Sequence, residues 1–400
     1  MDNIAKKTLL IIDWSNLMFR SLCLNALYGT TGRGTNYDSM DEMKSFIYKF
    51  AIDVCSLLNI FKAHKVIIAT DSPHPWRKDI DLGEIGYKGN RQRQGDYNWD
   101  NIFKCANDLL TYFSINGCEV TKVEHSEADD IVALCKEVVF EKYPDYNIII
   151  ISADADLRQL IDFNTLTNQY CVVYNTTTKG KTGKRFLYGT NDFINWLNKE
   201  EVTDIFFSGF DGAKKYIKDV INTNAMIEVA EENPNDIVIG KIFCGDEGDS
   251  VPAFYSWYTN GKKFRITPNK TKKLCEQIGI KKVNDVLKAC ESGQLEPIIE
   301  KVCNRKLEDI DVAERLNRQR LLVELNSSLF PDNIRLYKAD IDMLFQKNKQ
   351  LNYPMRAQKI LENTPYAGVS KRKTVEADIF KDLAKYAGTT NTNSKPDALF

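Results

Sequence analysis

The sequence predicts an α/β fold built on a parallel sheet. Short apolar runs rich in β-branched residues recur along the first two-fifths of the chain, and longer segments with helical periodicity separate them. Strand, helix and strand at this spacing are typical of a parallel sheet whose two faces are covered by helices. The expected strands are residues 8–12, 65–69, 118–123 and 147–151, and the expected helices are residues 40–61, 102–112 and 127–141.

The length and composition are those of a globular protein with more than one domain. The 400 residues leave room for two or three domains, and a content of 43% hydrophobic and 27% charged residues is not that of a disordered chain. A formal net charge of −1 gives no bulk attraction to polyanions, so nucleic acid would have to bind at a local basic patch. No apolar run is long enough to span a membrane and no leader peptide precedes the first strand, so we expect a cytoplasmic protein without membrane contact.

The cysteines, the histidines and the missing motifs exclude several kinds of site. None of the ten cysteines forms a CxxC pair, which indicates reduced thiols rather than disulfides or a zinc site. The three histidines, at positions 64, 74 and 125, are not accompanied by a GxSxG motif, so catalysis by histidine is not expected. No GxxxxGK[ST] or GxGxxG motif is present, so no such phosphate-binding loop is predicted.

The rest of the chain departs from the alternating pattern. Residues 72–100 are polar and of mixed charge, and we expect a mobile loop or arch there. Residues 175–240 are irregular with short helical pieces, as in an insertion on the sheet. We therefore expect a first domain over residues 1–240, a helical and basic region over 241–387, and a flexible tail over 388–400.

Acidic side chains gather where the predicted strands end. In an open parallel sheet these ends meet at one crevice, so acids located there are expected to converge. Each acid also has a structural explanation, because Ser126 and Asp129 fit a capping box and Asp154 or Asp156 fits the cap of the next helix. Together, however, carboxylates 4 Å apart repel by about 1 kcal/mol per pair in water and by about 4 kcal/mol at an effective dielectric of 20, so such a cluster requires cations. The acids concerned are Asp13, Asp71, Glu127, Asp129, Asp130, Asp154 and Asp156, and Asp246 and Asp249 follow on a later turn.

This set of ligands predicts a hard divalent cation. It offers only oxygen, and neither histidine nor cysteine accompanies it, which favours magnesium or manganese over zinc. Two such ions about 3.5–4 Å apart clamp the attacking and leaving oxygens of an in-line phosphoryl displacement. The pattern therefore predicts metal-dependent phosphoryl chemistry.

The segments that carry these acids resemble the structure-specific 5′ nucleases, which comprise flap endonucleases, the 5′-nuclease domain of bacterial DNA polymerase I and phage 5′→3′ exonucleases. The later segments NGKKFRITPNKTK (260–272) and LFPDNI (329–334) are most similar to the ribonucleases H of T-even phages. The likeness spans about residues 8–385 and implies a PIN-like sheet followed by a helical duplex-binding region. The matching blocks are IIDWSN (11–16), ATD (69–71), YKGNR (87–91), EADD (127–130), ISADADLRQL (151–160) and GDEGDSVP (245–252).

The resemblance also implies roles for individual residues. It implies a first metal site made of Asp13, Asp71, Glu127, Asp129 and Asp154, and a second made of Asp156, Asp246 and Asp249, with Asp130 in support. In the YKGNR block, Tyr87 matches a residue that stacks on a base, while Lys88 and Arg91 match basic groups that reach the scissile phosphate.

The chain departs from the family after Asp249. Most members have a Gly-rich helix-hairpin turn there, often with a potassium ion, but this sequence continues with Ser250, Val251 and Pro252 and an aromatic stretch, so no potassium ion is expected. Basic residues follow instead, and their position predicts contacts with the phosphate backbone that fix register without reading sequence. The residues predicted to bind nucleic acid in this way are Lys262, Lys263, Arg265, Lys270, Lys272 and Lys273.

The expected activity is hydrolysis near the 5′ ends of RNA–DNA hybrids and of branched or nicked DNA, with two Mg²⁺ ions or Mn²⁺ in their place. By the resemblance, a phage would use it to remove RNA primers during lagging-strand replication. We expect a monomer, with a sliding clamp or a single-strand-binding protein as a partner reached through Leu399 and Phe400 at the end of the tail. A catalytically silent nucleic-acid-binding scaffold and a single-strand PIN-type ribonuclease are the alternatives. The first has no reason to keep all the acids, and the second has no need of the basic region after Asp249.

Overall fold

The computed structural model describes residues 6–28, 36–82, 86–91, 96–177, 183–199, 208–224, 227–259, 262–307, 310–347 and 349–367. The predicted tail at 388–400 and the end of the region predicted at 241–387 lie outside these residues.

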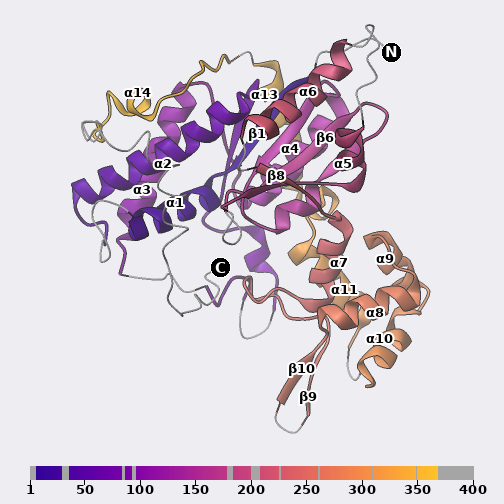
Figure 1. Cartoon of the computed structure of the whole chain (residues 1–400). Coiled ribbons are helices and arrows are strands. Elements are labelled where there is room, and N and C mark those ends of the chain that lie inside the picture. The colour runs from indigo at the N-terminus through magenta and orange to yellow at the C-terminus, as the bar shows by residue number, and fades with distance from the viewer. Residues whose placement is uncertain are drawn as a thin grey trace.

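A mostly parallel sheet forms the centre of the molecule (Figure 1). Its strands follow the order β3-β2-β1-β4-β6-β7-β8; the first five are parallel, β7 is antiparallel to β6, and β8 is parallel to β7. A short strand, β5 (Asp162–Asn164), pairs antiparallel with β6. The predicted fold class is confirmed. The other strands are β1 (Lys7–Asp13), β2 (Lys65–Thr70), β3 (Glu119–Lys122), β4 (Tyr146–Ile151), β6 (Gln169–Tyr174), β7 (Arg185–Gly189) and β8 (Ile227–Glu231).

Helices cover both faces of the sheet because alternate strand residues point to opposite sides. Leu10 and Ile12 pack into the hydrophobic cluster that includes residues of α1 (Trp14–Tyr28), α2 (Met40–Phe61) and α3 (Trp99–Ile115). Leu9 and Ile11 pack on the other side, in the cluster formed with α4 (Ala128–Lys142). Because the central strands are buried on both faces, they are continuous apolar runs in the sequence.

Helix α2 has the bounds predicted from its periodicity, and its termini explain them. Ser39 caps the first turn in a capping box with Glu42, and Lys62 ends the helix in a left-handed conformation with φ 43°. The cap of α4 differs from the prediction. It lies at Glu127 and pairs with Asp130, whereas the Ser126 hydroxyl donates to the carbonyl of Val123 instead.

Two segments outside the regular pattern are more ordered than the sequence predicts. The region predicted to be an insertion at 175–240 contributes β7 and β8 to the sheet, together with α5 (Asn191–Asn198) and α6 (Ser208–Thr223). The predicted mobile loop at 72–100 is wrong for its first part, where a short 3₁₀ helix, η1 (Trp76–Asp79), buries Trp76 and Arg77. The polar composition misleads here because Arg77 is buried by pairing with acids.

The predicted C-terminal region does not pack as one unit. Residues between 238 and 323 form a third hydrophobic cluster, whereas Phe330, Ile334 and Ile341 join the α4 side of the sheet. Helix α14 (Ala357–Leu361) lies against α2 and α3. Helices α12 (Asp332–Arg335) and α13 (Lys338–Gln346) carry Ile334 and Ile341 and so pack on the α4 side of the sheet. The third cluster includes residues of α7 (Pro234–Cys244), α8 (Pro268–Ile278), α9 (Val283–Glu291), α10 (Leu295–Cys303) and α11 (Val312–Val323).

An antiparallel hairpin lies between α7 and α8, in a stretch that the sequence predicts to be helical. It consists of β9 (Ser256–Thr259) and β10 (Lys262–Arg265) and projects away from the body of the molecule in Figure 1. The ten cysteines are all unpaired. Within the described ranges, no helix combines the length and the apolar character that crossing a bilayer requires.

Candidate active site

The first group of carboxylates lies where four parallel strands lead into the helices that follow them. Asp13 is the last residue of β1, and Asp71 follows β2 directly. Asp129 is in the first turn of α4, which comes after β3, and Asp154 lies three residues beyond β4. Asp13, Asp71, Asp129 and Asp154 are called the strand-end acids below.

The strand-end acids are close enough that neighbouring carboxylates raise the pKa of two of them, Asp13 and Asp129. Burial, then Asp71 and Asp154, raise the pKa of Asp13 to about 7, although the backbone N–H of Asn16 and the hydroxyl of Ser152 donate to it at 3.1 and 2.8 Å. Burial, then Asp154 and Asp13, raise the pKa of Asp129 well above its usual value. No described basic side chain forms an ion pair with a strand-end acid. The group therefore holds more negative charge than its surroundings balance.

Backbone contacts fix the positions of these acids. The N–H of Ala128 donates to Asp71 at 2.8 Å, which ties the end of β2 to the first turn of α4. The N–H of Asp156 donates to Asp154 at 2.9 Å, which orients that carboxylate in the turn after β4. The acids are thus held close together by the ends of the strands.

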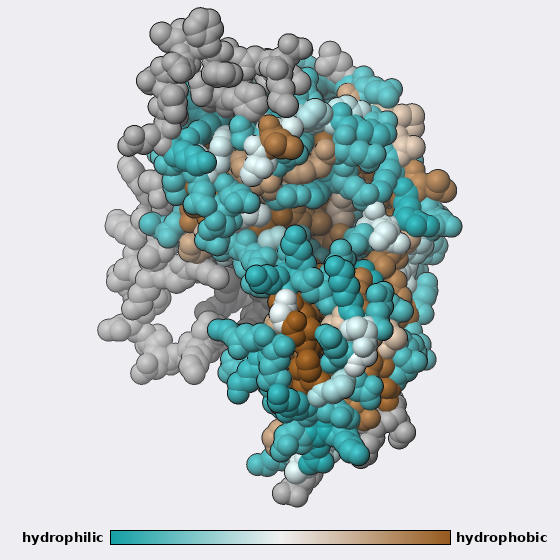
Figure 2. Space-filling model, turned by 90° about the vertical axis from the view of Figure 1, so that its right-hand side faces the viewer, coloured by the Kyte–Doolittle hydropathy of each residue, from teal (hydrophilic) through white to brown (hydrophobic). Residues whose placement is uncertain are grey.

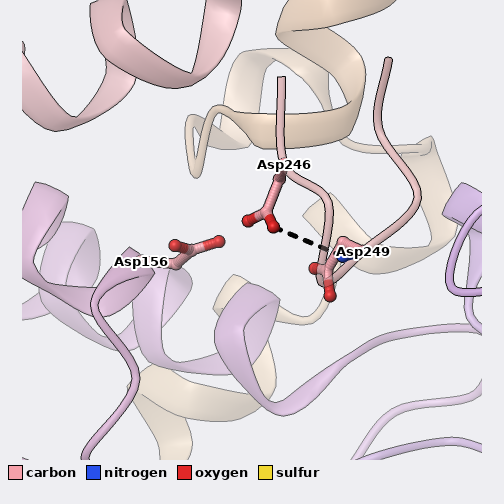
Figure 3. Close-up of side chains that lie close together, drawn as sticks. All are labelled: Asp156, Asp246 and Asp249. Carbon is pink, nitrogen blue, oxygen red and sulfur yellow. Dashed lines mark hydrogen bonds between the residues drawn. The ribbon is translucent and has the colours of Figure 1, made fainter. Parts of the chain in front are cut away.

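A second group consists of Asp156, Asp246 and Asp249. One carboxylate oxygen of each lies within 4.8 Å of the others, and among the described acids and metal-ligating side chains only these three meet so closely. Figure 3 shows Asp156 facing Asp246, with Asp249 on the same loop as Asp246. These are the residues for which the family resemblance implies a second metal ion; their role as ligands stays a prediction.

The loop that carries Asp246 and Asp249 is closed at its base. Asp246 and Val251 exchange two backbone hydrogen bonds of 2.9 and 2.7 Å. Gly245, with φ 70°, precedes them, and a Cβ atom there would lie 2.4 Å from the carbonyl oxygen of Val251, so only glycine fits. Within the loop, the Asp246 carboxylate accepts the N–H groups of Gly248 and Asp249 at 2.8 and 3.3 Å.

Lys241 supplies a positive charge inside this second group. Its ammonium, on α7, pairs with both Asp156 and Asp246. Burial would raise the pKa of Asp246, but Lys241 and the two N–H groups lower it below its usual value. The pKa of Asp156 is raised to about 6 by burial and by Asp154, although Lys241 opposes this shift. No sequence pattern indicates a role for Lys241, which lies in an apolar helix five positions before Asp246.

Glu127 and Asp130 are neutralised by a buried arginine that the sequence analysis missed. Arg77, 1% exposed, lies 2.9 Å from Glu127 and 2.7 Å from Asp130, and its Nε donates to the carbonyl of Leu321. The indole of Trp76 donates to the other oxygen of Asp130, and so does the N–H of Glu127. Both oxygens of Asp130 are therefore engaged, which agrees with a supporting role.

The turn at residues 86–91 connects Glu127 with the second acidic group. Lys88 pairs with Glu127 and lies 3.8 Å from Asp249, and Arg91 pairs with Asp249. Lys88 has a left-handed backbone, φ 58°, and its N–H donates to the carbonyl of Asp249 at 2.8 Å. The ring of Tyr87 is 6% exposed and its hydroxyl lies 3.2 Å from both Glu127 and Asp249. Its stacking on a base stays a prediction, because the ring packs in the third cluster here.

The residues predicted to bind the phosphate backbone lie on the hairpin and on α8. Lys262, Lys263 and Arg265 are exposed on β10, and Lys270, on the first turn of α8, places its ammonium 4.2 Å from the ring centre of Trp257. Lys272 and Lys273 follow on the same helix and are exposed. Arg265 also forms a 2.6 Å ion pair with Glu247. The basic surface is therefore attached to the loop of the second acidic group.

The donors at this site fit divalent cations. They are carboxylate oxygens, buried or half-buried except at the exposed Asp71, and the strand-end acids lack a counter-ion among the described residues. Such an arrangement can hold cations against a phosphate, while Lys88 and Arg91 bring positive charge to its edge.

Comparison with known proteins agrees with this geometry. Residues 8–206 match the family described as 5′-3′ exonuclease, N-terminal resolvase-like domain. No curated protein matches the sequence significantly. The D15 flap endonuclease of bacteriophage T5, in a pseudo-enzyme–product complex with DNA and metal ions, has the same fold, with a TM-score of 0.52 and 18% identity over 85% of this chain and 100% of that one. The T5 5′-exonuclease with divalent zinc ions bound gives a TM-score of 0.51 and 18% identity over 84% and 99% of the two chains. The chain thus carries the N-terminal resolvase-like domain of the 5′-3′ exonucleases and belongs to the 5′ nuclease family.

Proposed function

We propose that the chain is a magnesium-dependent, structure-specific 5′ nuclease that hydrolyses phosphodiesters near the 5′ ends of RNA–DNA hybrids and of nicked or flapped DNA. One observation carries the proposal: the strand-end acids bring like charges together without a described counter-ion, with Asp13 and Asp129 removed from solvent, beside a second group of three carboxylates. A protein that only binds nucleic acid gains nothing from such repulsion.

Asp13, Asp71, Glu127, Asp129 and Asp154 would hold one ion, and Asp156, Asp246 and Asp249 the other. When bound, two such ions supply an activated water and stabilise the charge that develops on the leaving 3′ oxygen. Mn²⁺ offers similar coordination and would substitute, whereas potassium is not part of the proposal.

Basic side chains complete the site. Lys88 is 19% exposed and lies between Glu127 and Asp249, which belong to the two different proposed ion sites, so its ammonium can bind a phosphate oxygen that enters between them. Arg91 is more exposed and lies at the outer edge, where it can hold the adjacent part of the backbone. The basic residues of the hairpin and of α8 would hold the nucleic-acid backbone, with a contribution to affinity that falls as salt rises.

The biological setting that we propose is removal of RNA primers from lagging-strand fragments of a phage, with a sliding clamp or a single-strand-binding protein as partner. The similarity of the segments at 260–272 and 329–334 to the ribonucleases H of T-even phages supports it.

The proposal is tested with a 5′-labelled RNA–DNA hybrid, a flapped DNA duplex and a single strand of the same sequence. The wild-type protein should cleave the first two only when Mg²⁺ or Mn²⁺ is present, and release products that carry a 5′ phosphate. Asp154→Asn should bind these substrates without cleaving them. Binding without cleavage by the wild type would favour the silent scaffold, and equal cleavage of the single strand would favour a single-strand PIN-type ribonuclease.

A further inference from the structure

The β9–β10 hairpin is firmly attached at its base. The N–H of Ile266 donates to the carbonyl of Tyr255 at 3.1 Å, and Arg265 forms its ion pair with Glu247 beside Asp246. The hydroxyl of Tyr255 donates to the carbonyl of Lys306 at 3.0 Å. Higher on the hairpin, Arg305 donates to the hydroxyl of Thr259 at 2.7 Å. The hairpin is therefore held in a fixed direction relative to the second acidic group.

One face of the hairpin is filled by its own aromatic residues. Trp257 stacks on Tyr255, with ring centres 5.4 Å apart, and on Phe264, with ring centres 6.0 Å apart. The ammonium of Lys270 covers the Trp257 ring. These contacts account for the aromatic stretch that replaces the Gly-rich turn of the family, with the exception of Tyr258.

Tyr258 lies on the opposite face. It is 68% exposed and pairs across the hairpin with Lys263, which puts a phenol ring and an ammonium side by side. Within the described ranges no ion pair involves Lys262 or Lys263, and no ring stacks on Tyr258. The lower end of the molecule, where the hairpin lies in Figure 1, is mostly hydrophilic on the face that Figure 2 shows.

We propose that Tyr258 and Lys263 bind an unpaired nucleotide of the nucleic acid held at the acid site, Tyr258 by stacking on the base and Lys263 by pairing with its phosphate. The proposal rests on the proposed function and specifies that the hairpin recognises a single-stranded part of the substrate. Bases inside a duplex stack on neighbours on both faces, so an exposed side-chain ring finds a free base face in a single-stranded segment and not along the duplex. The described residues of the two strands carry three basic groups and no acid, which complements a phosphate chain rather than a basic or apolar protein surface.

The test compares two ligands in EDTA, so that binding is measured without cleavage. One is a blunt DNA duplex and the other is the same duplex with a single-stranded 5′ arm that contains 2-aminopurine. Wild-type protein should bind the armed duplex more tightly and quench the 2-aminopurine fluorescence. Tyr258→Ala should weaken binding of the armed duplex by about tenfold, within the range for one stacked base, abolish the quenching and leave binding of the blunt duplex unchanged. Tyr258→Phe should behave like wild type, because stacking needs the ring and not the hydroxyl.

Two further variants complete the design. Lys263→Ala should reduce the salt dependence of arm binding by roughly 0.7, the value for one phosphate contact on a single strand. Leu166→Ala, at a 77% exposed residue in the turn between β5 and β6, is the matched control and should change neither affinity. Equal losses on both duplexes in Tyr258→Ala, or no loss on either, would overturn the proposal. Binding is measured here without metal, independently of cleavage. A wild-type protein that fails to cleave would therefore contradict the proposed function without contradicting this contact.

Discussion

The strand-end acids and the second acidic group differ in what balances their charge. No described cation pairs with Asp13 or Asp129, and the pKa of each is raised by burial and by like charges. In the second group Lys241 pairs with two of the three carboxylates, and the pKa of Asp246 is lowered. The first group therefore requires a cation from outside, whereas the second already contains one that an incoming ion must displace.

The largest effect should come from the group that has no internal cation. Asp13→Asn or Asp154→Asn should lower the single-turnover cleavage rate by roughly 1,000-fold or more, since a metal ion supplies several kilocalories per mole of transition-state stabilisation. Duplex affinity, measured by fluorescence anisotropy in EDTA, should stay close to that of wild type. Asp249→Asn should have a smaller effect on the rate, and Asp192→Asn, at an exposed acid on α5, is the control. Retained cleavage together with lost affinity would contradict the metal assignment.

The basic residues of the turn at 86–91 should affect the cleavage rate, whereas those on α8 should affect binding. Lys88→Ala or Arg91→Ala should lower the rate of the bound complex by roughly tenfold to 100-fold, as expected for contacts made in the transition state. Replacing Lys270, Lys272 and Lys273 together by alanine should instead weaken binding and flatten its salt dependence by roughly 0.9 per lost phosphate contact. The two quantities are measured in single-turnover kinetics and in salt titrations of binding. If both sets of variants change rate and affinity alike, this division of roles is wrong.

The internal cation itself can be removed. Lys241→Met keeps an apolar stem but no charge, so an ion no longer competes with the ammonium and Mn²⁺ should bind the second group roughly tenfold more tightly. Calorimetric titration of metal-free protein measures this affinity, and Lys241→Arg, which keeps the charge, serves as the matched control. Weaker Mn²⁺ binding in Lys241→Met would mean that the lysine supports the ion instead of competing with it.

The smallest effect concerns stability without metal. Asp13 and Asp156 have folded-state pKa values of about 7 and about 6, above those of an unfolded chain, so between about pH 4 and 7 the folded protein binds more protons than the unfolded one. The free energy of unfolding should therefore fall as pH rises through this window, and added Mg²⁺ should restore it at pH 8. Thermal unfolding in EDTA from pH 5 to 8 measures the trend, which Asp13→Asn should flatten. A midpoint that rises with pH would contradict the unbalanced charge of the strand-end acids.

The sequence predicted the parts of the site that depend on local patterns. The runs that end at Asp13 and Asp71 are buried central strands, so their composition identifies them, and the topology of a parallel sheet brings their ends together. Strands β7 and β8 were not predicted because they form the mixed end of the sheet, with β8 at its edge, and carry polar residues. Arg77 and Lys241 were not predicted for another reason. In the sequence each is an isolated basic residue, and only the fold brings it next to acids from other parts of the chain.

The contact between Arg77 and the carbonyl of Leu321 joins positions 244 apart in the chain. The same guanidinium holds Glu127 in place. The position of this acid in the N-terminal part of the chain therefore depends on α11, which lies nearly 200 residues later in the sequence. Contacts of such long sequence separation form only after a large loop has closed, which makes them slow steps in folding. During synthesis, therefore, the sheet can form well before the site is complete. A chain that stops before α11 would have all the acids of the site but would lack the backbone oxygen that orients the arginine between two of them.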